Sequence, residues 1–197
     1  MPLDLFLGLL VYAFVTSITP GPNNMMLMAS GVNFGFRRTI PHMLGIAIGF
    51  FSLLLAVGFG LGALLHAVPA LQTALKFLSV LYMLWLAWKI AFSRSMGKAE
   101  VGGQPLSFGQ AAAFQWVNPK AWAMSLVAMG AYTQAESPDV SVLLVGTAFA
   151  LVNFPSVSIW AGFGVALRGF LSDPRRLRVF NIVMGLALVA TLWPMLR

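Results

Sequence analysis

Two short polar motifs interrupt long apolar stretches of this 197-residue chain. The first motif consists of Thr19, Pro20, Gly21, Pro22, Asn23 and Asn24. The second consists of Asn118, Pro119 and Lys120. Proline removes a backbone donor and clashes with the carbonyl four residues earlier, so it disrupts the interior of a helix. Each motif therefore predicts that one helix ends and another begins, with Pro22 and Pro119 at the first helical positions.

The start of a helix is suited to binding a carboxylate. Free backbone N–H groups and a partial positive charge collect there, and both attract anions. If the two new half-helices run in opposite directions, their positive ends converge on one ligand. Each proline could instead only kink a helix for packing, and this alternative stays open. Two breaks at corresponding positions, both beside asparagine, favour a binding site.

Lys120 strengthens the prediction of a binding site. A cation in the first turn opposes the helix dipole, and a charge in the middle of a membrane costs at least about 2.5–3.5 kcal/mol. The acidic residues, which lie at predicted helix ends or in loops, are Asp4, Glu100, Glu136, Asp139 and Asp173. Lys120 is therefore either partly deprotonated or paired with an anion from outside the chain. Snorkelling to the interface is the alternative, but Lys120 lies more than about three turns from the cytoplasmic end of its predicted span.

Three further polar residues are weaker candidates. Asn153, close to Pro155, predicts a third break that lines the pathway, with simple packing as an equal alternative. Lys76 and His42 are candidates for carrying protons, because their side chains can change charge inside a membrane protein. The alternatives are that Lys76 snorkels to the outer face and that His42 has an interfacial role.

The composition indicates that membrane helices position these residues. The chain is 59% apolar and 9% charged, whereas about 25% of residues are charged in ordinary soluble domains. A span needs roughly 20 mostly apolar residues. The predicted fold is an all-α integral membrane protein with six transmembrane helices, over residues 3–28, 39–65, 70–92, 108–132, 140–167 and 177–196.

The spans divide into two halves of the chain. Residues 1–92 form the first three-helix repeat, residues 93–107 form a cytoplasmic linker, and residues 108–197 form the second repeat. Because each half has an odd number of spans, related halves would enter the membrane from opposite sides, as inverted repeats do. The first helix of each half carries its proline break.

The basic residues predict the orientation of the chain. Those that follow the first, third and fifth spans are Arg37, Arg38, Lys89, Arg94, Lys98, Arg168, Arg175, Arg176 and Arg178. Only Arg197 lies at the opposite side. Positive residues mark cytoplasmic loops, so both termini are predicted outside. The net charge of +7 therefore reflects topology, with contact to membrane lipid, and does not indicate nucleic acid.

The composition also excludes several functions. Without cysteine, the chain can form neither a disulfide nor a thiolate metal site. With two histidines and five acids, a metal centre or a two-carboxylate hydrolase is hard to assemble. We therefore expect no catalytic residues, no metal and no cofactor. The alternatives to a transporter are a passive channel, a structural membrane subunit or, on weaker grounds, a membrane-embedded enzyme.

Several segments resemble the LysE/RhtB family of amino-acid exporters. These are the segments 18–24, 35–37, 82–89 and 114–120, and the resemblance extends over essentially the whole chain. It implies export of amino acids or their derivatives across the bacterial inner membrane, driven by the proton-motive force. Segments 22–24, 86–91 and 105–108 are most similar to the cysteine and O-acetylserine exporters. Homoserine, threonine and leucine remain open as substrates.

The family resemblance and the residue types indicate the same binding site, but they differ on whether transport is coupled to protons. Proton-driven transporters often use a buried carboxylate, and no acid lies in the interior of a predicted span here. Protons would have to be carried by Lys120, Lys76 or His42, or by the substrate itself. We expect Lys120 and the two helix starts to bind the carboxylate of a small amino acid, and carbonyls freed at the breaks to bind its ammonium group. A homodimer is compatible with so small a bundle.

Overall fold

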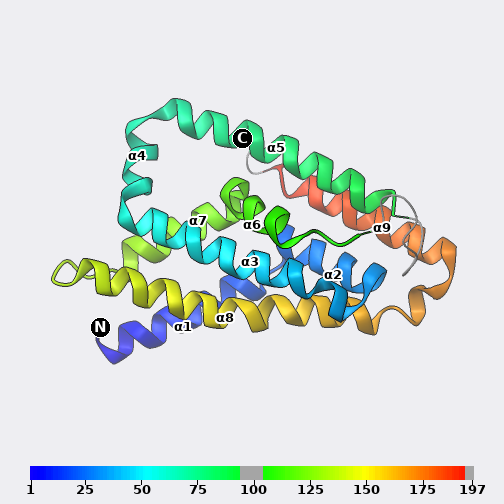
Figure 1. Ribbon diagram of the computed structural model, residues 1–197, viewed down its shortest axis with the longest axis horizontal. Coiled ribbons are helices and arrows are strands. Elements are labelled where there is room, and N and C mark those ends of the chain that lie inside the picture. Colours follow the sequence, from blue (N-terminus) through cyan, green and yellow to red (C-terminus); the bar gives the residue numbers. More distant parts are fainter. Residues whose placement is uncertain (94–103, 194–197) are drawn as a thin grey trace.

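The computed structural model describes residues 1–93 and 104–193. These residues form helices and connecting turns without strands, which confirms the all-α class. The helices are α1 (Leu3–Ile18), α2 (Pro22–Phe34), α3 (Phe36–Ala56), α4 (Gly62–Ala67), α5 (Pro69–Ala91), α6 (Phe108–Val117), α7 (Pro119–Tyr132), α8 (Pro138–Ala166) and α9 (Pro174–Ala190). A π-helical turn, Val57–Leu61, joins α3 to α4. Most of these helices lie along the long axis of the molecule (Figure 1).

Three stretches among the described residues are long and apolar enough to cross a membrane. They are the run from α3 into α4 (Phe36–Leu65), α5 and α8. The pair α1 and α2 adds a fourth if it is one span, bent by 55°. In contrast, α6, α7 and α9 have only 10, 14 and 17 residues. Helix length thus accounts for up to four of the six predicted spans.

Close backbone contacts hold the helices in pairs. Helix α2 packs along α8, α3 along α6, and α5 along α9. A Cβ atom on Gly31 of α2 would lie 2.2 Å from the carbonyl oxygen of Ala161 in α8. A Cβ atom on Gly45 of α3 would lie 2.4 Å from the carbonyl oxygen of Phe108 in α6. Small residues let membrane helices approach in this way, so these glycines fix the positions of the broken helices.

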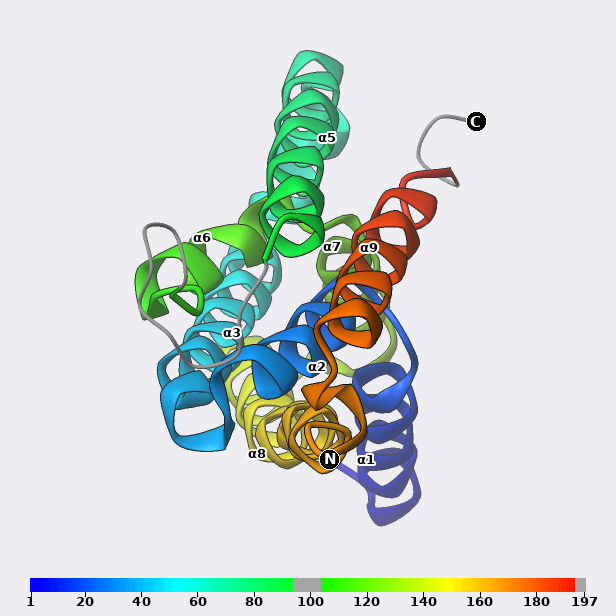
Figure 2. The same ribbon diagram turned by 90° about the vertical axis from the view of Figure 1, so that its right-hand side faces the viewer.

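Two large apolar clusters fill most of the interior. The first contains Phe50 and Phe149, whose rings meet edge to face with centroids 5.6 Å apart. The second contains Met43, Met83 and Phe114, all fully buried. Figure 2 views the bundle along its long axis, with α5 and α9 together on one side. Because each cluster includes residues from both halves of the chain, the two halves pack as one body.

The two predicted proline breaks are present. Helix α1 ends at Ile18 and α2 begins at Pro22. Helix α6 ends at Val117 and α7 begins at Pro119, with Asn118 between them. Both prolines occupy the first helical position, where the missing N–H group is not needed.

The predicted third break at Pro155 is wrong. Helix α8 runs without interruption from Pro138 to Ala166 and contains Pro155. The hydroxyls of Ser156 and Ser158 donate to the carbonyls of Val152 and Phe154, at 2.7 Å each. A single proline with such neighbours is tolerated in a membrane helix, whereas two prolines and a glycine in succession are not.

The described basic residues other than Lys76 and Lys120 gather at one end of the molecule. Arg37 and Arg38 lie in the first turn of α3, Lys89 in the last turn of α5, and Arg168 just after α8. Arg175, Arg176 and Arg178 begin α9, at the same end (Figure 1). The predicted positions of Arg94, Lys98 and Arg197, and most of the predicted linker, lie outside the described residues.

Candidate functional site

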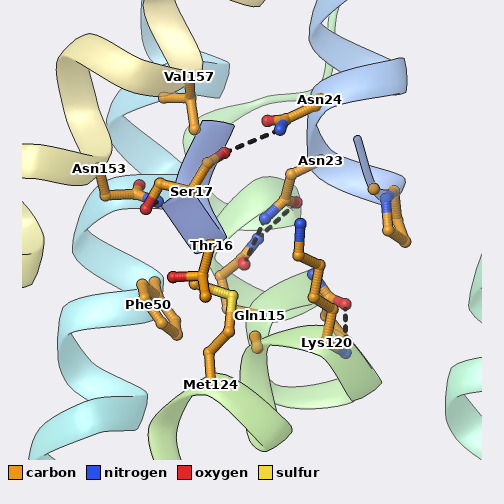
Figure 3. Close-up of a pocket in the computed structure, with 14 residues that line it drawn as sticks. Thr16, Ser17, Asn23, Asn24, Phe50, Gln115, Lys120, Met124, Asn153 and Val157 are labelled. Atoms are coloured by element: carbon orange, nitrogen blue, oxygen red, sulfur yellow. Dashed lines mark hydrogen bonds between the residues drawn. The ribbon is translucent and has the colours of Figure 1, made fainter. Parts of the chain in front are cut away.

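A cavity lies between the two helix breaks and is lined by six helices (Figure 3). Its lining residues are Thr16, Ser17, Gly21, Pro22, Asn23, Asn24, Phe50, Gln115, Asn118, Lys120, Ala121, Met124, Asn153 and Val157. We call this cavity the break pocket. Seven predicted site residues thus come together: Gly21, Pro22, Asn23, Asn24, Asn118, Lys120 and Asn153. The other three, Thr19, Pro20 and Pro119, form the breaks without lining the pocket.

The start of α2 is open toward the break pocket. Gly21 is its N-cap residue, in an extended conformation, and no side chain caps it. Pro22 has no N–H group to satisfy, and Asn23 and Asn24 follow it along the pocket wall. The first backbone N–H groups of a helix lack partners within the helix. The start of α2 therefore presents unpaired donors and the positive end of the helix dipole to the pocket.

The carbonyls at the end of α1 already have partners. Asn24 donates from Nδ2 to the carbonyls of Ser17 and Thr19, at 2.9 Å each. Trp160 of α8 donates from Nε1 to the carbonyl of Ile18 at 3.0 Å. Side chains of the protein thus satisfy the carbonyls that were expected to bind a substrate ammonium group.

The start of α7 is capped by its own sequence. Asn118 is buried, and its Oδ1 accepts a hydrogen bond from the backbone N–H of Lys120 at 3.1 Å. Trp122 donates from Nε1 to the carbonyl of Trp116 at 2.8 Å, which closes the end of α6. Of the two helix starts that the sequence predicted as open to a ligand, only the start of α2 lacks a side-chain cap.

Lys120 links the two breaks. Its Nζ donates to the carbonyl of Thr19 at 2.7 Å. Gly21 leaves room for this side chain, because a Cβ atom there would lie 2.9 Å from Cδ and 3.1 Å from Nζ of Lys120. Among the described residues that line the break pocket, Lys120 alone carries a charge. The ammonium group therefore lies beside the open start of α2. An anion at this position would contact both the ammonium group and the free backbone N–H groups of α2.

A second link between the breaks was missed by sequence reasoning. Asn23 donates from Nδ2 to Oε1 of Gln115 at 2.8 Å, and Gln115 donates back from Nε2 to Oδ1 of Asn23 at 3.0 Å. Figure 3 shows the two amides facing each other beside Lys120. Gln115 is 0% exposed and lies in an apolar segment only three residues before Asn118. A polar residue within an apolar segment, so close to the second break, was the signal in the sequence that could have identified Gln115 as a site residue.

Asn153 contributes an acceptor to the break pocket. Its Nδ2 donates to the hydroxyl of Ser17 at 3.1 Å. Its Oδ1 is buried and has no hydrogen-bond partner among the described residues. A buried acceptor without a donor is costly unless water or a ligand supplies one. The pocket thus combines a cationic side with an unpaired acceptor in a space of about 20 Å³, room for roughly one water molecule.

The other candidates for proton coupling lie elsewhere. Lys76 is exposed on α5 and lines neither the break pocket nor the cavity that contains His42. His42 is buried in that other cavity, on α3. Within the part of the chain that is described, no three metal-ligating side chains come together. Of the three candidates, only Lys120 lies in the break pocket.

Known proteins resemble this chain over nearly its whole length. The family model described as LysE type translocator matches residues 14–191, which include both breaks. The chain is 30% identical over 181 residues to the cysteine/O-acetylserine efflux protein of Salmonella paratyphi A, with 90% of each chain covered. It is 31% identical to the protein of the same name from Escherichia coli (strain K12), with the same coverage. No solved structure matches the chain.

Proposed function

This chain belongs to the LysE type translocator family, and we propose that it is a secondary transporter that exports small neutral amino acids or their derivatives. The family and the long apolar helices make it a multi-pass protein of the inner membrane. The relatives named as cysteine/O-acetylserine efflux proteins make these two compounds the first substrates to test.

One observation carries the proposal: the open start of α2 and the ammonium group of Lys120 line the same buried pocket. A carboxylate placed between them accepts hydrogen bonds from the backbone N–H groups of Asn23 and Asn24 and from Lys120 Nζ. Hydrogen bonds to charged groups contribute about 1.5–3 kcal/mol each. The substrate ammonium group donates to Oδ1 of Asn153, which no described residue satisfies.

The size of the break pocket makes substrate loading a conformational step. Its present space of about 20 Å³ holds roughly one water molecule, far less than an amino acid. When the substrate carboxylate replaces the Thr19 carbonyl as the partner of Lys120, one of the two links between the breaks is lost. Separation of the breaks then requires only that the amide pair of Asn23 and Gln115 also opens. A substrate that binds the separated arrangement more tightly shifts the population toward it.

The walls of the break pocket favour a small, neutral side chain. Around its polar groups lie Phe50, Met124 and Val157, together with the hydroxyls of Thr16 and Ser17. No acidic residue lines it within the described chain, so a cationic side chain would find no counter-charge there. A short polar side chain such as that of cysteine or O-acetylserine matches these walls.

Six spans in two inverted repeats remain part of the proposal. The contacts between the halves are reciprocal: α1 packs on α8 while α6 packs on α3. Helix α3 packs on α8, and α5 packs on α9. A two-fold relation that exchanges the halves predicts these pairs, because it exchanges α1 with α6 and α3 with α8. The clustered basic residues support a cytoplasmic face at that end, with both termini outside.

Transport by reconstituted vesicles tests the proposal. Vesicles that contain the purified protein are given labelled cysteine, O-acetylserine, threonine, homoserine or leucine, with and without an imposed pH gradient. We expect at least one small neutral amino acid to accumulate above its external concentration only when the gradient is present. A passive channel would equilibrate the substrate and no more. Equilibration alone, or no transport of any of these compounds, would overturn the proposal of a proton-coupled exporter.

A further inference from the structure

A second cavity lies at the basic end of the molecule. It is formed by the second half of α2, the first turns of α3, the end of α5 and the segment 104–106. Its polar lining residues are Ser30, Asn33, His42, Lys89, Ser93 and Gln104. We call it the basic-end cavity. Its space of about 50 Å³ exceeds the 20 Å³ of the break pocket, so it has room for several water molecules.

His42 is the unsatisfied group of the basic-end cavity. The residue is 1% exposed, and neither Nδ1 nor Nε2 has a hydrogen-bond partner among the described residues. Burying a polar group without a hydrogen bond is costly. Buried polar groups of this kind generally bond to ordered water or to a ligand. His42 therefore needs a partner that enters the cavity.

Several of the other polar lining residues already have hydrogen-bond partners within the protein. Ser30 and Thr39 share a hydrogen bond of 2.9 Å between their hydroxyls. Asn33 donates to Oδ1 of Asn181 at 2.9 Å, and Asn181 donates to the carbonyl of Ser93 at 2.8 Å. These bonds join the ends of α2 and α5 to α9 and form a fixed polar wall. The imidazole of His42 makes no hydrogen bond to any of these described residues.

Lys89 gives the cavity its charge. Its ammonium group lies 5.5 Å from the centre of the Trp85 ring and makes no hydrogen bond to another described residue. No acidic residue lines the cavity within the described chain, and Lys89 is its one charged lining residue there. A cation and an imidazole N–H without acidic neighbours suit an anion, and a carboxylate accepts hydrogen bonds from both. Met26, Leu86 and Leu106 provide an apolar side for the rest of a small ligand.

Helix α2 connects this cavity to the break pocket. Asn23 lines the break pocket and Ser30 lines the basic-end cavity. Seven residues, or two turns, separate these two positions, so they lie on the same face of α2, about 10 Å apart. The two cavities therefore lie along the same face of α2, a short distance apart.

We propose that the basic-end cavity is a carboxylate-binding site at which the substrate docks from the cytoplasm before it reaches the break pocket. His42 and Lys89 bind the carboxylate, and the apolar side accommodates the remainder of the molecule. The identity of the ligand and the direction of transport rest on the proposed function. The presence of a carboxylate site in this cavity does not, so it can be tested without transport.

Thiol labelling of the full-length protein tests the site, because the natural chain contains no cysteine. Ser30→Cys places one thiol in the cavity wall, and the matched control Ser79→Cys places one at a buried position on α5 that lines neither cavity. We expect Ser30→Cys to react with a negatively charged thiosulfonate about three-fold faster than with a positively charged one of similar size. Lys89→Met should remove this preference and Lys89→Arg should keep it. Ser79→Cys should stay unreactive.

Protection by acetate completes the test. Acetate should slow the labelling of Ser30→Cys, whereas its uncharged analogue acetamide should not, and His42→Leu should weaken the protection. The proposal is overturned if Ser30→Cys is as unreactive as Ser79→Cys, if Lys89→Met leaves the charge preference unchanged, or if acetate and acetamide act alike. None of these labelling outcomes determines the result of the export assay. Protection by acetate in a protein that exports no amino acid would establish the carboxylate site and remove its role in substrate docking.

Discussion

The two helix breaks face each other across one pocket, yet they satisfy their backbone groups differently. At the first break, the carbonyls at the end of α1 depend on Asn24, Trp160 and Lys120, of which Trp160 and Lys120 come from outside the α1–α2 segment. At the second break, Asn118 caps α7 and Trp122 closes α6, both from within the same segment. The first break is held by the tertiary structure, and the second is held by its own sequence.

This difference assigns different tasks to the two breaks. The first leaves the start of α2 without a side-chain cap, so its donors are available to a ligand. At the second, Asn118 caps the backbone N–H of Lys120, and this capped first turn fixes the position from which Lys120 reaches the pocket. We therefore expect substrate binding to depend on the open end of α2 together with Lys120, while the second break acts as the support for that lysine.

Removing the charge of Lys120 should have the largest effect. Lys120→Met should lower the rate of amino-acid uptake by vesicles about 10–100-fold, because one hydrogen bond to a charged group contributes about 1.5–3 kcal/mol. Lys120→Arg should retain more activity than Lys120→Met. Lys76→Met is the matched control, since Lys76 is exposed on α5, and it should transport normally. Full transport by Lys120→Met would remove Lys120 from the site.

Removing the side-chain amide at the first break should come next. Asn24→Leu leaves the carbonyls of Ser17 and Thr19 without the Nδ2 donor that both share. We expect a loss of about 1–3 kcal/mol in the free energy of unfolding, measured as a lower thermal transition of the purified protein in detergent. An unchanged transition would show that the first break does not depend on Asn24.

Removing the cap at the second break should cost less. Asn118→Ala deletes the acceptor for the backbone N–H of Lys120, and loss of an N-cap side chain typically costs about 1 kcal/mol. The thermal transition of this variant is measured in the same way and compared with that of Asn24→Leu. If Asn118→Ala proved the more damaging of the two, the contrast between the breaks would be reversed.

A methyl group at Gly21 should have the smallest effect. Gly21 is extended, so alanine fits its backbone, but the new Cβ atom would lie 2.9 Å from Cδ of Lys120. The end of a lysine side chain can move, so we expect a few-fold rise in the substrate concentration that gives half-maximal transport. The Lys120→Met background should abolish this rise, since methionine has no ammonium group that the new methyl group could displace from its position beside the carbonyl of Thr19. An equal rise in both backgrounds would mean that Gly21 acts independently of Lys120.

Local sequence chemistry was enough to predict both breaks. Pro22 and Pro119 each begin a helix, and Asn118 caps the helix after it, as neighbouring residues alone indicate. The prediction at Pro155 was wrong because a long membrane helix can continue through a single proline when other groups bond to the backbone groups that the proline frees.

The contacts that complete the pocket could not be predicted in the same way. Gln115 pairs with Asn23 across 92 positions of the chain, and Trp160 reaches Ile18 across 142. These pairs exist only because α6 and α8 pack beside the first break. The same packing satisfies the carbonyls of Ser17, Ile18 and Thr19, whereas the sequence led us to expect free carbonyls at the breaks.

Recognition of the carboxylate is tested most directly by comparing a transported amino acid with its α-amide, which has the same shape and no negative charge. Both compounds compete for uptake into vesicles that contain either the natural protein or Lys120→Met. For the natural protein we predict that the amino acid competes about ten-fold or more better than the amide, equivalent to about 1.4 kcal/mol, and that Lys120→Met largely loses this preference. The ratio is insensitive to how much protein is folded. The same ratio in both proteins would contradict the binding of the substrate carboxylate by Lys120.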